Sequence, residues 1–194
     1  MVLTLAAVAT GAGLCGGVAG AITGRICGAR AGSGRSPKIA KQVKVEGVGN
    51  VKVHTQVKRK KTFITLDTEA MLGVSDLPFC SAVACPDGTI YVSGVVAAQR
   101  ASDGSPEIVP GGPEAETKKI LEVIDACLRA CGATMDDITI VNAFLVDYTD
   151  ERFAVMNRGY MRFWGNRKLP ARICTGTDRV GLGGNVEFSC IARV

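Results

Sequence analysis

Histidine is almost absent from this chain of 194 residues, which has a single one, His54. Proton transfer by a histidine pair and a zinc site with two Cys and two His ligands both require at least two histidines. The eight cysteines form no Cys-x-x-Cys pair and show neither a disulfide framework nor a metal-ligand spacing. We interpret them as small core residues in a reducing compartment, and we expect no metal and no cofactor.

Acidic residues are scarce in the first third of the chain. Residues 1–62 contain eleven Lys or Arg and one acid, Glu46, whereas residues 63–194 contain twelve Lys or Arg and seventeen acids. This asymmetry predicts a boundary near Thr62 between a basic arm and an acidic domain. The acidic domain argues against nucleic acid as a partner.

Charge is missing altogether from Val2 to Gly24, a stretch rich in Ala, Gly, Val and Leu. A membrane-spanning helix needs about 20 such residues. Three interpretations of residues 1–36 stay open: a membrane anchor, an organelle-targeting segment, or a flexible Gly-rich arm. The corresponding prediction for localisation is organellar, namely mitochondrial, with membrane association in the case of an anchor.

Residues 37–62 are basic, and their valines alternate in the way that is typical of strands. Gly47-Val48-Gly49-Asn50 is a turn signal, so the segment is predicted to be either a linker or a hairpin. Lys58-Arg59-Lys60-Lys61 is either a solvated cluster or a contact to anionic lipid or to an acidic partner. Residues 1–61 are thus the part through which membrane or membrane-complex contact is expected.

Residues 63–194 have the pattern of one α+β domain. Pro113 and Gly132 bracket one predicted helix, and Thr149 caps a second helix. Segments with strand-like patterns surround them. The prediction is a single mixed β-sheet with two helices on one face. The strand-like segments are 63–66, 81–85, 90–97, 138–146, 172–180 and 186–193.

Two charged residues near the C-terminus suggest chemistry. Arg172 begins one strand-like segment, and Glu187 follows fifteen residues later in the next segment along the chain. Arginine is the side chain best suited to hold a small carboxylate by two hydrogen bonds. A half-buried glutamate can serve as a general base for water. The pair therefore predicts a site that hydrolyses a small anionic molecule, and the alternatives are an interface ion pair for Arg172 and a surface glutamate for Glu187.

The surrounding sequence resembles the Rid family of 2-imino acid deaminases, the YjgF/UK114 group that is also called L-PSP endoribonuclease. The resemblance covers residues 77–194 and rests on eight short stretches in the right order. They are Leu77–Ala82, Ile90–Gly94, Glu114–Thr117, Cys131–Ile138, Ala143–Asp147, Asn157-x-x-Tyr160, Pro170-Ala171-Arg172 and Val186-Glu187-Phe188.

This resemblance implies a chorismate-mutase-like fold and a homotrimer with its sites at the subunit interfaces. It implies hydrolysis of 2-imino or enamine acids, of the 2-iminobutanoate and 2-iminopropanoate type, to 2-oxo acids and ammonia. Arg172 would bind the substrate carboxylate and Glu187 would activate the water, without a cofactor. The small anionic imino or keto acid is the expected ligand.

Four further residues match or lie near the family's pocket. Ser93 and the backbone amide of Cys174 are expected to bind substrate, and the alternative for both is simple packing. Asn157 is included near the substrate, although it could instead tie down its helix. Phe79 stands where relatives with strong deaminase activity usually carry Tyr, so a possible hydrogen bond is missing and activity is expected to be weaker.

Three functions are therefore weighed. The first is the deaminase. The second is a non-catalytic accessory subunit of the same fold, tethered to a membrane or an organellar assembly through the N-terminal segment. The third is the ribonuclease activity in the family's other name, which lacks support because the domain has neither a histidine pair nor a basic groove.

Overall fold

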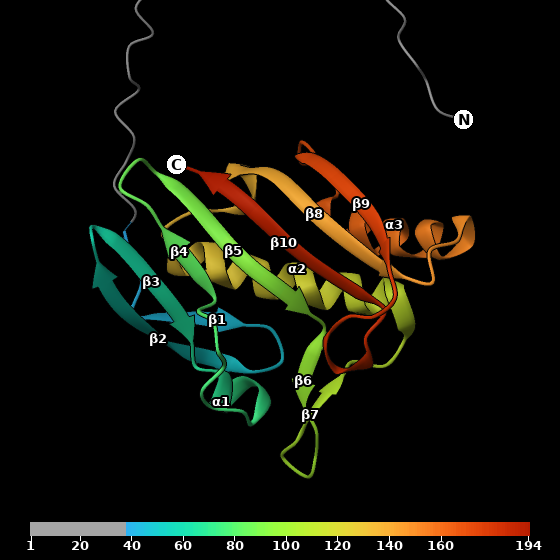
Figure 1. Ribbon diagram of the computed structural model, residues 1–194, viewed down its shortest axis with the longest axis horizontal. Helices are drawn as coiled ribbons and strands as arrows, with labels where there is room; N and C mark the ends of the chain where they lie inside the picture. Colours follow the sequence, from blue (N-terminus) through green and yellow to red (C-terminus); the bar gives the residue numbers. More distant parts are fainter. Residues whose placement is uncertain (1–37) are drawn as a thin grey trace, which may run out of the picture. The chain divides into compact units, whose positions relative to one another are not determined.

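The computed structural model describes residues 38–194, all of which belong to one compact unit. Its main element is an eight-stranded sheet in the order β1-β2-β3-β4-β5-β10-β8-β9 (Figure 1). All neighbouring strands are antiparallel except β8 and β9, which are parallel. The strands are β1 (Gln42–Val45), β2 (Gly49–Lys58), β3 (Lys61–Leu66), β4 (Ala82–Ala84), β5 (Thr89–Val96), β8 (Ile138–Val146), β9 (Ala171–Thr177) and β10 (Val186–Arg193).

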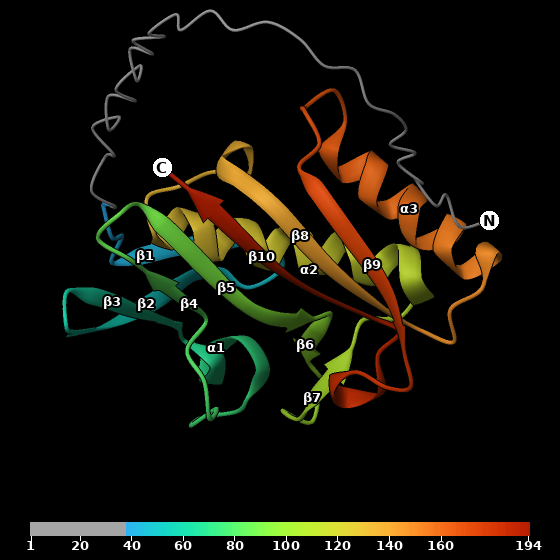
Figure 2. The same ribbon diagram turned by 45° about the horizontal axis from the view of Figure 1, so that its top comes forward.

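Two long helices, α2 (Gly112–Ala130) and α3 (Asp150–Trp164), cover one face of this sheet and leave the other face open (Figures 1 and 2). The α+β prediction is thus confirmed, with one large mixed sheet and few helices. The Thr149 side chain caps α3 by accepting a hydrogen bond from Arg152 N at 3.2 Å. Gly159 lets α3 approach α2 closely, because a Cβ there would lie 2.5 Å from the Glu114 carbonyl oxygen.

Smaller elements gather at one end of the sheet. The short helix α1 (Thr68–Leu72) follows β3, and a two-stranded ribbon of β6 (Ala98–Arg100) and β7 (Pro106–Ile108) follows β5. Two 3₁₀ turns, η1 (Met135–Asp137) and η2 (Gly181–Gly183), precede β8 and β10. Neither α1, the ribbon nor the two turns was predicted from the sequence.

The basic segment before residue 62 is part of the sheet. The β1–β2 hairpin turns at the glycines that predicted it, and Val43, Val45 and Val51 are buried in the core. Arg129 of α2 donates a hydrogen bond to the Lys44 carbonyl oxygen at 2.6 Å. The expected boundary near Thr62 therefore lies inside β3, because the buried valines join this hairpin to the same core.

The predicted hydrophobic segment, residues 1–36, lies outside the described residues. Within residues 38–194 no helix is long and apolar enough to cross a membrane. Anchor, targeting segment and flexible arm therefore remain predictions.

Candidate active site

Arg172 lies on the edge strand β9, on the side of the sheet that α3 covers. Its guanidinium carbon is 4.6 Å from the centre of the Tyr160 ring and 5.6 Å from that of Phe153, both of α3. Among the described residues, Arg172 makes no ion pair and its side chain makes no hydrogen bond. Stacking on two rings fixes the position of the guanidinium while leaving its five N–H donors for a ligand.

Two other predicted residues lie on this side. Asn157 is on the stripe of α3 that contains Phe153 and Tyr160, so it lies between the two rings along the helix. Cys174, two residues after Arg172, faces the same way and packs partly against the core. Burial raises the pKa of the Cys174 thiol, and the nearby Arg172 lowers it only in part. The thiol is therefore protonated near neutral pH and poorly suited to nucleophilic attack.

Glu187 lies on β10 and projects from the open face. Its neighbours Val186 and Phe188 are buried under the helices, so strand alternation turns Glu187 the other way. The pairing of β5 with β10 contains a bulge, because Val95 pairs with Phe188 whereas Val92 pairs with Cys190. This bulge places Ser93 and Gly94 beside the glutamate.

Gly94 makes room for the Glu187 carboxylate. A Cβ built on Gly94 would overlap Glu187 Oε1. Among the residues that the structure describes, this carboxylate takes part in no hydrogen bond or ion pair. An unpaired, half-buried carboxylate in such a position is available to water or to a ligand.

Ser93 and Phe79 lie on this second side. The Ser93 hydroxyl donates a hydrogen bond to the Cys80 carbonyl oxygen at 2.7 Å, so it can only accept from a substrate in this arrangement. Phe79 is 52% exposed and lines the same hollow as Ser93 and Gly94. The hollow therefore has a flat aromatic wall where a tyrosine would offer a hydroxyl group.

Arg172 and Glu187 do not meet within one chain. β8 lies between their strands, and Arg172 pairs with Val141 whereas Glu187 pairs with Phe144, three residues further along β8. Two strand spacings and three residues separate the Cα atoms by about 10 Å in each direction. The side chains also project from opposite faces, so one substrate molecule cannot contact both in the same chain.

A buried carboxylate that the sequence analysis missed anchors the start of β10. Glu116 of α2 is 1% exposed, and its side chain accepts hydrogen bonds from Asn185 N at 2.7 Å and Val186 N at 3.1 Å. The Asn185 side chain bonds to Glu116 as well, and it accepts a hydrogen bond from Arg152 of α3. Glu116 thereby positions the backbone directly before Glu187.

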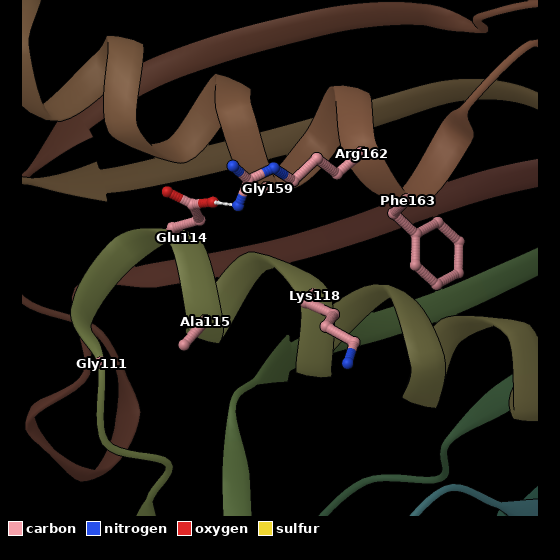
Figure 3. Close-up of a pocket in the computed structure, with 7 residues that line it drawn as sticks. All are labelled: Gly111, Glu114, Ala115, Lys118, Gly159, Arg162 and Phe163. Atoms are coloured by element: carbon pink, nitrogen blue, oxygen red, sulfur yellow. Dashed lines mark hydrogen bonds and ion pairs between the residues drawn. The ribbon is translucent and has the colours of Figure 1, made fainter.

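A hollow of about 530 Å³ between α2 and α3 is a weaker candidate for a site (Figure 3). Glu114 and Arg162 form an ion pair across it, and Arg158 also bonds to Glu114 at 3.2 Å. Lys118, the other charged residue in its wall, pairs with Glu122 at 3.7 Å. Since each charge has a partner, we interpret this hollow as a helix–helix contact.

Comparison with known proteins identifies the family. A model of the family described as endoribonuclease L-PSP matches residues 74–194. The chain belongs to this family. The RutC family protein UK114 of Drosophila melanogaster is 34% identical over 115 residues, which are 59% of this chain and 78% of that protein.

Solved structures of the L-PSP, or Rid, family share the fold. A putative endoribonuclease of Thermotoga maritima is 27% identical with a TM-score of 0.53, and the match covers 62% of this chain and 89% of that one. A Rid family protein of unknown function from Yersinia pestis is 26% identical with a TM-score of 0.54, covering 63% and 93%. The predicted family resemblance is confirmed.

Some of the described chain lies outside the family match. The match begins at residue 74, after β1, β2, β3 and α1. Arg172, Glu187, Phe79, Ser93, Asn157 and Cys174 all lie inside it. His54 lies outside it, on β2, four strands from β10, which is about 19 Å at the usual strand spacing. The histidine is therefore too far from Glu187 in one chain to share a proton with it.

The described part of the chain has no cluster of metal-binding side chains. Residues 38–194 contain no group of three or more His, Cys, Asp or Glu side chains arranged to hold a metal ion. Burial raises the pKa of Cys131 and Cys190 to about 12 each, so both stay protonated at neutral pH. Protonated thiols are poor metal ligands. The expectation of no metal and no cofactor stays a prediction.

Proposed function

We propose that this protein is a Rid-type deaminase that hydrolyses 2-imino acids to 2-oxo acids and ammonia. The observation that supports this most strongly is the state of Arg172 and Glu187. Both residues occupy the family motif, both are partly buried, and neither has a charged partner among the described residues. Burying unpaired charges has a cost that a structural role would not repay.

We further propose that a second copy completes the site. Arg172 of one copy and Glu187 of the next would then flank one substrate, as expected for the family's homotrimer. The open face of the sheet supports such an assembly, because it exposes large apolar side chains that a monomer would normally bury. Tyr91 is 49% exposed, Phe144 37% and Ile173 55%.

The reaction needs few groups. The Arg172 guanidinium binds the substrate carboxylate by two hydrogen bonds and holds the imine carbon in place. Glu187 takes a proton from a water molecule as the water oxygen forms a bond to the imine carbon, and it passes this proton to the imine nitrogen. The hydroxyl proton of the resulting carbinolamine is then transferred to the nitrogen in the same way, the C–N bond breaks, and ammonia and the 2-oxo acid are released. The carboxylate next to the imine makes this carbon electrophilic enough to need no metal.

Phe79 sets the expected level of activity. A tyrosine hydroxyl in this wall would add one hydrogen bond to substrate or water, and such a bond contributes about 0.5–1.5 kcal/mol. The protein is therefore expected to be slower than a relative with tyrosine there, by up to about tenfold.

The test is ammonia release from an imine that an amino-acid oxidase generates in the assay. The full-length protein should speed hydrolysis well above the rate in buffer, and Glu187→Gln should lose turnover while still binding a 2-oxo acid. Equal turnover in Glu187→Gln and wild type would show that Glu187 is structural.

A further inference from the structure

An apolar cavity is lined by Gly94, the residue at which a Cβ would overlap the Glu187 carboxylate. Its volume is about 430 Å³, within the range of pockets that enclose small ligands. Phe79 and Ser93 line it together with Gly94. The cavity and the Glu187 carboxylate thus share Gly94 as a neighbour.

The cavity extends past the end of β5 into the region between α1, α2 and η2. Met71 comes from α1, Val123 from α2 and Leu182 from η2, and Val96 lies between them on β5. α1 lies before the residues that the family model matches. Two elements that were not predicted from the sequence, α1 and η2, thus help to enclose the cavity.

The cavity wall offers no charge, and its polar side chains carry three hydroxyl groups, those of Thr68, Ser81 and Ser93. None of its lining residues is Asp, Glu, Lys, Arg or His. The Ser81 hydroxyl accepts a hydrogen bond from Leu66 N at 3.1 Å, and the Ser93 hydroxyl donates to Cys80 O. Burying a charged substituent there would leave it without a charged partner, whereas burying an apolar one is favourable.

From these observations we infer that the cavity binds the side chain of the substrate. The preferred substrates are then 2-imino acids with a large apolar side chain, such as those derived from leucine, methionine and phenylalanine. This inference rests on the proposed deaminase function, and it differs from the short three- and four-carbon imino acids that the family resemblance implies. The short ones would leave most of the cavity empty.

The experiment compares kcat/KM for imines from leucine, phenylalanine, alanine and glutamate, each made in the assay by an L- or D-amino-acid oxidase. The imine has no stereocentre at its reacting carbon, so either oxidase gives the same substrate. The leucine and phenylalanine imines should exceed the alanine imine by at least about tenfold, and the glutamate imine should be the poorest. An alanine imine that reacts as well as the leucine imine would overturn the inference.

A substitution in the cavity wall tests whether the cavity causes the substrate preference. Leu182 is 52% exposed, so Leu182→Trp should fold and narrow the cavity. It should reduce the ratio of leucine to alanine kcat/KM at least about threefold. Met161→Trp, at a residue of α3 that is 50% exposed and outside the cavity lining, is the matched control and should keep the wild-type ratio. An unchanged ratio in Leu182→Trp would contradict the assignment.

A binding measurement distinguishes a failure of this inference from a failure of the deaminase proposal. If no imine is hydrolysed faster than in buffer, the deaminase proposal is wrong, and the cavity is then tested by calorimetry with 2-oxo acids. 4-Methyl-2-oxopentanoate and phenylpyruvate should bind at least about tenfold more tightly than pyruvate. Equal or tighter binding of pyruvate would overturn the cavity assignment by itself.

Discussion

The Arg172 side and the Glu187 side of the sheet hold their charged groups in different ways. Arg172 is on an edge strand, and two aromatic rings of α3 support it. Glu187 is on a central strand, and a bulge and a glycine make room for it. One side is thus built from side-chain packing and the other from backbone geometry.

The difference shows what each side lacks. The Arg172 side offers a guanidinium, and the Glu187 side offers a carboxylate, with no cation among the described residues that line the apolar cavity. In the proposed reaction, a substrate with a carboxylate, an imine and an apolar side chain needs both sides. Under this proposal the two sides complement one another when two copies meet.

Removing the guanidinium should have the largest effect on the Arg172 side. Arg172→Ala should lower kcat/KM at least about 100-fold, because two charged hydrogen bonds contribute about 1.5–3 kcal/mol each. Arg172→Lys should stay poor, since an ammonium group cannot form the paired geometry. Steady-state kinetics with the leucine imine measures both, and circular dichroism checks the fold. If Arg172→Ala turned over substrate as fast as wild type, Arg172 would not be part of the site.

The matching change on the Glu187 side acts through the backbone. Gly94→Ala should displace the Glu187 carboxylate, because the new Cβ overlaps Oε1 at the end of a flexible side chain. Such a displacement should lower kcat by about tenfold to 100-fold while the protein stays folded. Combining it with Glu187→Asp, whose side chain is shorter, should cost less than the two single changes together. Fully additive losses would mean that Gly94 acts in another way.

A smaller effect should follow from the support of Arg172. Tyr160→Leu removes a ring from beneath the guanidinium and should raise KM about three- to thirtyfold with less change in kcat. Tyr160→Phe is the matched control, because it keeps the ring and removes a hydroxyl that has no hydrogen-bond partner among the described residues. If Tyr160→Phe and Tyr160→Leu raise KM equally, the ring does not support the guanidinium by stacking.

The smallest effect on activity is expected from the β1–β2 hairpin, which belongs to neither side. Val45 is fully buried, so Val45→Ala should lower the free energy of unfolding by about 2 kcal/mol. Val57→Ala, at a residue 69% exposed, should change it by less than about 0.5 kcal/mol. Urea denaturation measures both. Equal effects would mean that the hairpin is not part of the core.

The regular elements could be predicted from local patterns. β8 and β10 have the predicted bounds, and α3 begins at its Thr149 cap, because alternation, helical period and capping are properties of neighbouring residues. The position of the expected boundary near Thr62 falls inside β3, because charge asymmetry describes the surface, whereas the valines at alternate positions decide what joins the core.

The arrangement of the site could not be predicted in the same way. Arg172 and Glu187 are close in sequence, but their relative position depends on β8 lying between their strands and on strand register. The bulge at Ser93 and Gly94 and the bonds between Glu116 and β10 join residues far apart in the chain. The family resemblance identified the candidate residues and implied that the sites lie at subunit interfaces. The motifs did not show that Arg172 and Glu187 project from opposite faces of the sheet in one chain.

The central claim is that each site takes Arg172 from one copy and Glu187 from another, and mixing two inactive variants tests it most directly. Arg172→Ala and Glu187→Gln, each inactive alone, should regain activity when they are unfolded and refolded together. In a random equal mixture, about one quarter of the interfaces combine an intact Arg172 with an intact Glu187. Activity near a quarter of the wild-type value is therefore expected, and a mixture no more active than either variant alone would contradict a site shared between copies.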